Sequence, residues 1–173
     1  MITLFLTTFS RKLNAFDPFR ALLKNLRTDT LPQVLYGPQG SFFALLLRET
    51  VQALDRSHLV VLPTEQEAMT LVEDLERFGV PARLFPSWGT VPYKELGSTA
   101  SVFGQRVKVL VDIPAIRKGI VVTSLRAFLH LLPERSYLEQ KLVVLRKGQR
   151  VDPQGLASLL TSYGYLRVPK VSI

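Results

Sequence analysis

The segment with the clearest chemical potential is the glycine-containing loop at residues 37–44, which reads GPQGSFFA. It follows a β-prone run at residues 33–37 and precedes a stretch, 41–57, with apolar residues near helical spacing. In α/β proteins, nucleotide phosphates bind at such a strand–loop–helix, on backbone amides and the positive end of the helix. This loop is therefore the first candidate for nucleotide chemistry.

A working P-loop, G-x-x-x-x-G-K-[ST], needs a second glycine, a lysine for the phosphates and a hydroxyl for magnesium. With Gly37 as the first glycine, these three positions are held by Phe42, Phe43 and Ala44. The cation and the metal ligand are absent, and two rings fill the space that phosphate needs. We therefore predict a degenerate nucleotide loop that binds no nucleotide, with Phe43 largely buried. Its residues are Gly37, Gly40, Ser41, Phe42, Phe43 and Ala44.

The loop also has a plainer interpretation. Gly37 and Gly40 would then only make a tight strand-to-helix turn, and the two phenylalanines would be core residues. Both interpretations exclude chemistry at the loop. They differ in ancestry, because a P-loop backbone without its reactive residues is typical of a retired nucleotide domain.

Other chemical candidates are weaker. His58 and His130 have no metal-ligand partner at useful spacing, so we expect both to be structural or exposed. A set of acidic residues is most simply the solvated face of an amphipathic helix; it comprises Glu65, Glu67, Glu73, Asp74 and Glu76. The sequence thus predicts no catalytic centre, no metal site and no cofactor.

Composition limits the class of protein. The chain has 173 residues, 47% of them apolar, which suits one domain or slightly more and excludes a disordered tail. The absence of cysteine excludes disulfides and thiolate sites and favours a cytoplasmic protein. We expect no secretory signal and no membrane span. The net charge of +8 suggests nucleic acid or an acidic protein as a partner, although the basic residues are scattered along the sequence.

The hydrophobic pattern predicts an α/β fold. Apolar strand runs occur at 33–37, 58–63, 82–86 and 119–124. Helical patterns occur between and around them, at 17–28, 41–57, 64–79, 101–116 and 125–132. This alternation indicates a parallel sheet with helices on both faces. Its core should include Val60, Val61, Val121 and Val122.

The pattern of predicted strands and helices changes after Pro133. Residues 141–151 favour a strand and turn, Asp152 and Pro153 begin a helix that reaches about Tyr163, and 164–172 favour a final strand. We therefore expect three parts. They are an N-terminal extension with a helix at 1–30, the α/β domain at 31–133, and the start of a small α+β domain at 134–173.

The degenerate loop and the order of the segments around it resemble those of the N-terminal module of bacterial transcription-repair coupling factor, Mfd. The likeness covers about residues 33–171. It is carried by GPQG at 37–40, by 58–78, by the FPSWGTVPY segment with Trp88, Pro92 and Tyr93, by 104–114 with Arg106, and by 119–133. RKGQR at 146–150 and GYLRV at 164–168 extend it into the tail.

The damage-recognition protein UvrB is the nearest alternative, because the module is similar to UvrB without its ATPase. UvrB keeps an intact Gly-Lys-Thr in the first loop, where this chain has Phe42, Phe43 and Ala44. UvrB also inserts a long tyrosine-rich hairpin where this chain has a short loop. Both departures favour the coupling factor, with a UvrB-like, helicase-like fold.

The resemblance implies a role in nucleotide excision repair. Such a parent recognises RNA polymerase stalled at a DNA lesion, displaces it by ATP-driven translocation and recruits UvrA. Polymerase, DNA, ATP and magnesium belong to its other domains, so this fragment is expected to be non-catalytic. Residues 134–173 would be an incomplete UvrA-binding domain.

Two arginines carry over from the family by position. Arg150 in RKGQR and Arg167 in GYLRV correspond to arginines that contact UvrA. An arginine offers a planar, permanently charged fork that pairs bidentately with carboxylates. We expect both to be exposed and close in space.

Two competing functions remain open from the sequence. One is a cryptic P-loop ATPase that takes its lysine from elsewhere, such as Lys94 or Lys108. The other is a UvrB-type DNA-damage-binding domain, which would bind duplex with steep salt dependence.

Overall fold

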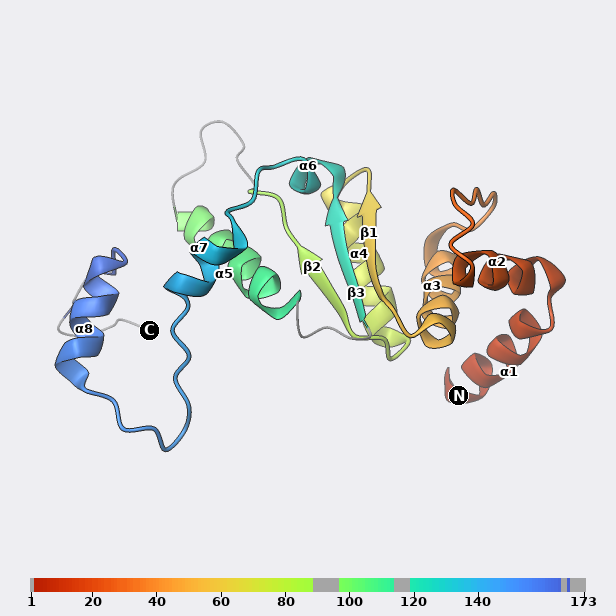
Figure 1. Cartoon of the computed structure of the whole chain (residues 1–173). Helices are drawn as coiled ribbons and strands as arrows, with labels where there is room; N and C mark the ends of the chain where they lie inside the picture. Colours follow the sequence, from red (N-terminus) through yellow and green to blue (C-terminus); the bar gives the residue numbers. More distant parts are fainter. Residues whose placement is uncertain (1, 89–96, 114–118, 166–167, 169–173) are drawn as a thin grey trace. The chain divides into compact units, whose positions relative to one another are not determined.

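The computed structural model describes residues 2–88, 97–113, 119–165 and 168. The chain divides into two compact units, Met1–Leu132 and Pro133–Ile173, which are described separately (Figure 1). Among the described residues of either unit, no helix is long and apolar enough to cross a membrane.

The first unit is built on a three-stranded parallel sheet. Its strands are β1 (Ser57–Leu62), β2 (Ala82–Phe85) and β3 (Gly119–Ser124), and β3 lies between the other two (Figure 1). The register aligns Val60 with Val122, and Leu84 with Val122 on the other side. The predicted α/β class with a parallel sheet is confirmed.

Helices cover both faces of the sheet. On one face, α3 (Gly40–Leu54) and α4 (Glu65–Arg77) enclose the main core, in which Leu75, Ile120 and Val122 are almost fully buried. On the other face, α5 (Gly97–Asp112) and α6 (Leu125–Phe128) pack around Phe85 and Val121. Alternate residues of β3 point to the two faces, as the two-residue period of a strand requires.

The local sequence explains why α4 begins where it does. The Thr64 hydroxyl accepts a hydrogen bond from the Glu67 amide, and the Glu67 carboxylate accepts one from the Thr64 amide. This capping box satisfies two amides that the first helical turn leaves unpaired. After Arg77, Gly79 ends the segment with a φ of +74°, a conformation that favours glycine.

Two helices precede α3, where the sequence had indicated one. They are α1 (Ile2–Asn14) and α2 (Asp17–Arg27), and together with α3 they enclose a second core around Leu13, Phe19 and Leu46. The start of α2 at Asp17 and Pro18 follows the sequence prediction. The helix α1 was not predicted.

The strand predicted at 33–37 does not form, and this prediction is wrong. The Gln33 side chain accepts a hydrogen bond from Asn25 Nδ2 at its Oε1 and donates one from its Nε2 to the Thr30 carbonyl, so the segment is tied to the end of α2. Tyr36 is 93% exposed. A β-prone sequence becomes a strand only when a sheet edge pairs with it.

The absence of this strand from the sheet bears on the predicted core. Val121 and Val122 are buried as predicted, Val60 is half-buried, but Val61 is exposed. In the described residues β1 pairs with β3 alone and so lies at a sheet edge. Val61 points to the face opposite α4, which α6 covers only in part.

The second unit contains α7 (Arg135–Lys141) and α8 (Pro153–Ser162). Asp152 caps α8, as the sequence indicated, by accepting hydrogen bonds from the Gln154 and Gly155 amides. The strand predicted within 141–151 is absent: residues 142–146 carry no regular structure and are exposed. Most of the final predicted strand lies outside the described residues.

Candidate functional site

The loop at 37–40 turns through two glycines with positive φ, Gly37 at +101° and Gly40 at +53°. It leads directly into α3, whose N-cap residue, Gln39, makes no side-chain capping bond. The predicted turn at the start of a helix is therefore present. The Ser41 hydroxyl donates to Asp74 Oδ2 of α4 at 2.7 Å, so it is engaged within the protein.

The three positions that a P-loop uses for chemistry are packing positions here. Ala44 is completely buried, and Phe43 is half-buried against the main core, so its burial is less complete than predicted. Phe42 is 45% exposed and lies edge-to-face on Phe9 of α1, with ring centroids 6.1 Å apart. A lysine at 43 would have to place its stem among core side chains.

A cavity of about 590 Å³ lies beside this loop. The loop, the end of β1 and one side of α4 line it, and the walls are chiefly apolar, with Phe43, Leu62 and Leu71 among them. Its charged lining residues are Glu67 and Asp74, and among the described residues no lysine or arginine lines it. Arg77 pairs with Asp74 from outside the cavity, so the described lining itself presents two carboxylates and no cation, which disfavours a phosphate group there.

A second polar cluster lies at the carboxyl ends of the strands. The guanidinium of Arg106, from α5, is 4.1 Å from the Phe85 ring centroid and 4.6 Å from that of Trp88. Its Nη1 donates to the Pro86 carbonyl at 2.6 Å. Arg106 is only 2% exposed, and in the described part of the chain its Nη2 has no hydrogen-bond partner. Burial lowers the pKa of Arg106, and the negative charge of Glu65 opposes that shift.

The prediction that the acidic residues of α4 form a solvated face is wrong for Glu65. This residue is half-buried, and its carboxylate accepts hydrogen bonds from the Ser87 amide at 3.0 Å and the Ser124 hydroxyl at 2.7 Å. Glu65 therefore links the start of α4 to the ends of β2 and β3. Of the others, Glu67, Glu73 and Glu76 are exposed and Asp74 is half-buried.

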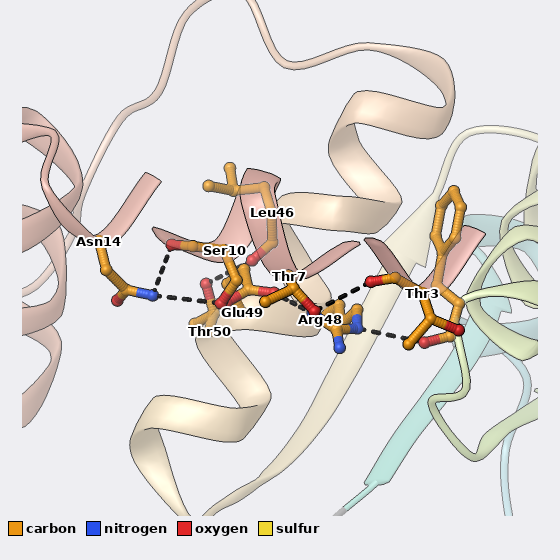
Figure 2. Close-up of polar contacts among 9 residues, drawn as sticks. Thr3, Thr7, Ser10, Asn14, Leu46, Arg48, Glu49 and Thr50 are labelled. Atoms are coloured by element: carbon orange, nitrogen blue, oxygen red, sulfur yellow. Dashed lines mark hydrogen bonds and ion pairs between the residues drawn. The ribbon is translucent and has the colours of Figure 1, made fainter. Parts of the chain in front are cut away.

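A third cluster joins α1 to α3 and was not foreseen (Figure 2). Glu49 of α3 is 3% exposed, accepts a hydrogen bond of 2.6 Å from the Ser10 hydroxyl and pairs with Arg48. The Arg48 Nε donates to the Phe78 carbonyl after α4. Because α1 itself was not predicted, nothing in the sequence pointed to a partner for Glu49.

The histidines lie apart from these clusters. His58 lies on β1, with its Nδ1 3.0 Å from the carbonyl of Arg56 just before the strand, and burial lowers the pKa of His58. The buried Nε2 of His130 has no partner in the described part of the chain. Among those same residues, no group of three His, Asp or Glu is arranged to hold a metal ion.

Of the two predicted partner-binding arginines, Arg150 is exposed and follows a turn closed by the Gln149 amide and the Arg146 carbonyl. Arg167 lies outside the described residues, as does Lys94. Lys108 is exposed on α5, which packs on the opposite face of the sheet from the degenerate loop. It is therefore poorly placed to replace the missing P-loop lysine.

Comparison with known proteins gives a consistent result, although no protein-family model matches the chain. It is 23% identical to the transcription-repair-coupling factor of Escherichia coli over 76% of its length. The identities are 26% for the factor of Haemophilus influenzae, over 74% of the chain, and 21% for that of Borreliella burgdorferi, over 80%. The chain spans about one eighth of the length of these relatives, since the matches cover 12%, 11% and 12% of them. The comparisons thus confirm that the chain resembles the transcription-repair-coupling factors.

Proposed function

We propose that this chain is a non-catalytic, UvrB-like module of a transcription-repair-coupling factor and that it recruits UvrA in transcription-coupled repair. The similarity to three such factors supports the assignment to repair. The parent would be an ATP-dependent DNA translocase that acts on RNA polymerase and DNA through its other domains. The module would work in the cytoplasm.

The non-catalytic part of the proposal rests on one observation. The position of the P-loop lysine is held by Phe43, whose ring packs against the core beside a cavity lined by carboxylates. Lysine, hydroxyl and magnesium supply most of the charge stabilisation in phosphoryl transfer. Without them the loop lacks the groups that hold the terminal phosphates and magnesium and that activate a triphosphate.

Recruitment of UvrA is assigned to the second unit. Its exposed segment 141–151 carries four basic residues and no acidic one: Lys141, Arg146, Lys147 and Arg150. An exposed arginine beside other cations suits an acidic partner surface and can pair bidentately with a carboxylate. Arg150 is the described residue that the family resemblance assigns to this contact, and Arg167 is the second.

The test is the affinity of the full-length protein for UvrA. We expect Arg150→Ala and Arg167→Ala each to weaken binding by about 1.5–3 kcal/mol without unfolding the domain, as loss of charge-assisted hydrogen bonds predicts. Arg77→Ala on α4 is the matched control, because Arg77 is equally charged and exposed in the other unit. Equal, near-zero effects at all three positions would show that these arginines do not carry recognition.

A further inference from the structure

The cavity beside the degenerate loop has the build of a receptor for a protein side chain. Phe43, Leu62 and Leu71 provide an apolar floor and walls, and Gln66, Thr70 and Asp74 of α4 add polar lining. Gln66 and Thr70 are exposed, whereas Leu71 is 6% exposed. A buried apolar surface next to exposed polar groups suits a ligand with an apolar end and a polar neighbour.

The charge around this cavity is opposite to that of the whole chain. The chain carries +8, yet α4 holds five of its 14 acidic residues against one basic residue, Arg77. Glu65 faces the strand ends instead, because it bonds Ser87 and Ser124. Glu67 and Asp74 remain at the cavity. The local field therefore attracts cations in a protein that elsewhere favours anions.

Both carboxylates keep acceptor capacity. Asp74 accepts from Ser41 through Oδ2 and from Arg77 through Oδ1. Glu67 Oε2 accepts from Thr64. A carboxylate offers about four lone-pair sites, so each can accept a further bond from an ammonium or guanidinium group.

We propose that this cavity binds a short segment of a partner protein in which a large apolar side chain lies next to a lysine or arginine. The apolar side chain packs on Phe43 and Leu71, and the cation pairs with Asp74 or Glu67. The ligand would thus carry a charge opposite to that of a nucleotide. This inference is independent of UvrA recruitment, because it concerns the other unit of the chain.

The experiment titrates the isotopically labelled 173-residue chain with three eight-residue peptides and follows backbone amides by NMR. In one peptide leucine alternates with lysine, in the second leucine alternates with glutamate, and in the third serine alternates with lysine. We expect saturable shifts confined to residues 38–43 and 62–74 with the leucine–lysine peptide. The other two peptides should bind at least about tenfold more weakly, since one lacks the charge match and the other the apolar contact.

Two variants locate the site. Thr70→Trp places a large ring at an exposed lining position and should weaken binding of the leucine–lysine peptide at least about tenfold, by occupying the cavity. Met69→Trp is the matched control, because Met69 is 43% exposed on the same helix. Asp74→Asn should weaken binding about 2–5-fold, the value of a partly exposed ion pair.

Several results would overturn the proposal. Equal binding of the three peptides, shifts that map away from the cavity, or unchanged affinity in Thr70→Trp would each do so, and binding of ATP at the cavity would contradict its charge argument. The amide spectrum of each variant reports its folding. If Thr70→Trp does not fold, Gln66→Trp replaces it at another exposed lining position.

Discussion

Arg106 shows how one residue organises the carboxyl edge of the sheet. Its guanidinium lies between the rings of Phe85 and Trp88 and bonds the Pro86 carbonyl. A planar guanidinium can stack on aromatic faces and donate hydrogen bonds in its own plane at the same time, which an ammonium cannot. Arg106 thereby fixes the chain that leaves β2 against α5.

Replacement of Arg106 should loosen this arrangement. We expect Arg106→Met to lower the free energy of unfolding by about 1.5–3 kcal/mol, because a charged hydrogen bond is lost and the Pro86 carbonyl loses its donor. Trp88 is the single tryptophan of the chain, so its fluorescence reports the same site and should shift to the red. Chemical denaturation and emission spectra measure the two effects.

Lys108→Met supplies the control, since Lys108 is an exposed cation on the same helix. Arg106→Lys separates charge from shape: if stacking and planarity matter, it should resemble Arg106→Met more than the parent. An unchanged emission maximum and stability in Arg106→Met would show that Arg106 does not hold Trp88 in place.

At the scale of elements, α1 docks on α3 through apolar packing and a polar contact. The Ser10 hydroxyl reaches the buried Glu49 carboxylate on α3 (Figure 2). Leu13 packs in the core with Leu46. A buried carboxylate must be paired and hydrogen-bonded to be tolerated. Glu49 therefore favours the docked position of α1, where Ser10 supplies a donor that complements Arg48.

The contact between Ser10 and Glu49 can be measured by a double-mutant cycle. Ser10→Ala should lower the free energy of unfolding by about 1.5–3 kcal/mol, the range for a hydrogen bond to a charged group. Glu49→Gln should lower it too, and the two changes should be coupled by about 0.5–3 kcal/mol. Hydrogen exchange of the α1 amides should accelerate in each variant.

Thr7→Ala serves as the reference, because Thr7 is exposed and its hydroxyl donates to the Thr3 carbonyl of the same helix. A coupling energy near zero, with α1 exchange unchanged in Ser10→Ala, would mean that apolar packing alone holds the helix.

For the whole molecule, we expect that nucleotide does not change the thermal stability. A ligand present at a hundred times its dissociation constant stabilises a protein by about 2.7 kcal/mol. We expect millimolar ATP with magnesium to leave the melting temperature of the chain unchanged, because the loop offers Phe43 where a cation is needed. Thermal denaturation with and without nucleotide decides this. A saturable rise in melting temperature that Gly40→Val abolishes would contradict it.

The sequence predicted those parts of the molecule whose signals are local. The helical pattern at 64–79 and the apolar run at 119–124 are short-range patterns, and both elements formed as predicted. Residues 33–37 and 142–146 have equally strong β-prone composition but formed no strand, because a strand requires a partner that composition does not specify.

The candidate sites divide in the same way. The loop, its two glycines and the residues at 42–44 that we compare with a P-loop were evident from spacing alone. The bonds from Glu65 to Ser124 and from Ser10 to Glu49 join residues 59 and 39 positions apart in the chain. Such contacts depend on how the elements pack, so no periodicity or motif announces them.

The position of β1 at a sheet edge has a consequence for colloidal behaviour. Leu59 and Val61 of β1 are 57% and 38% exposed. In the described part of the chain β3 pairs with one edge of β1, and no strand pairs with its other edge. Such an edge is a template for pairing between copies. The net charge of +8 makes copies repel each other. Salt shortens the range of that repulsion to about 10 Å at 0.1 M, so ionic strength governs how closely two such edges approach.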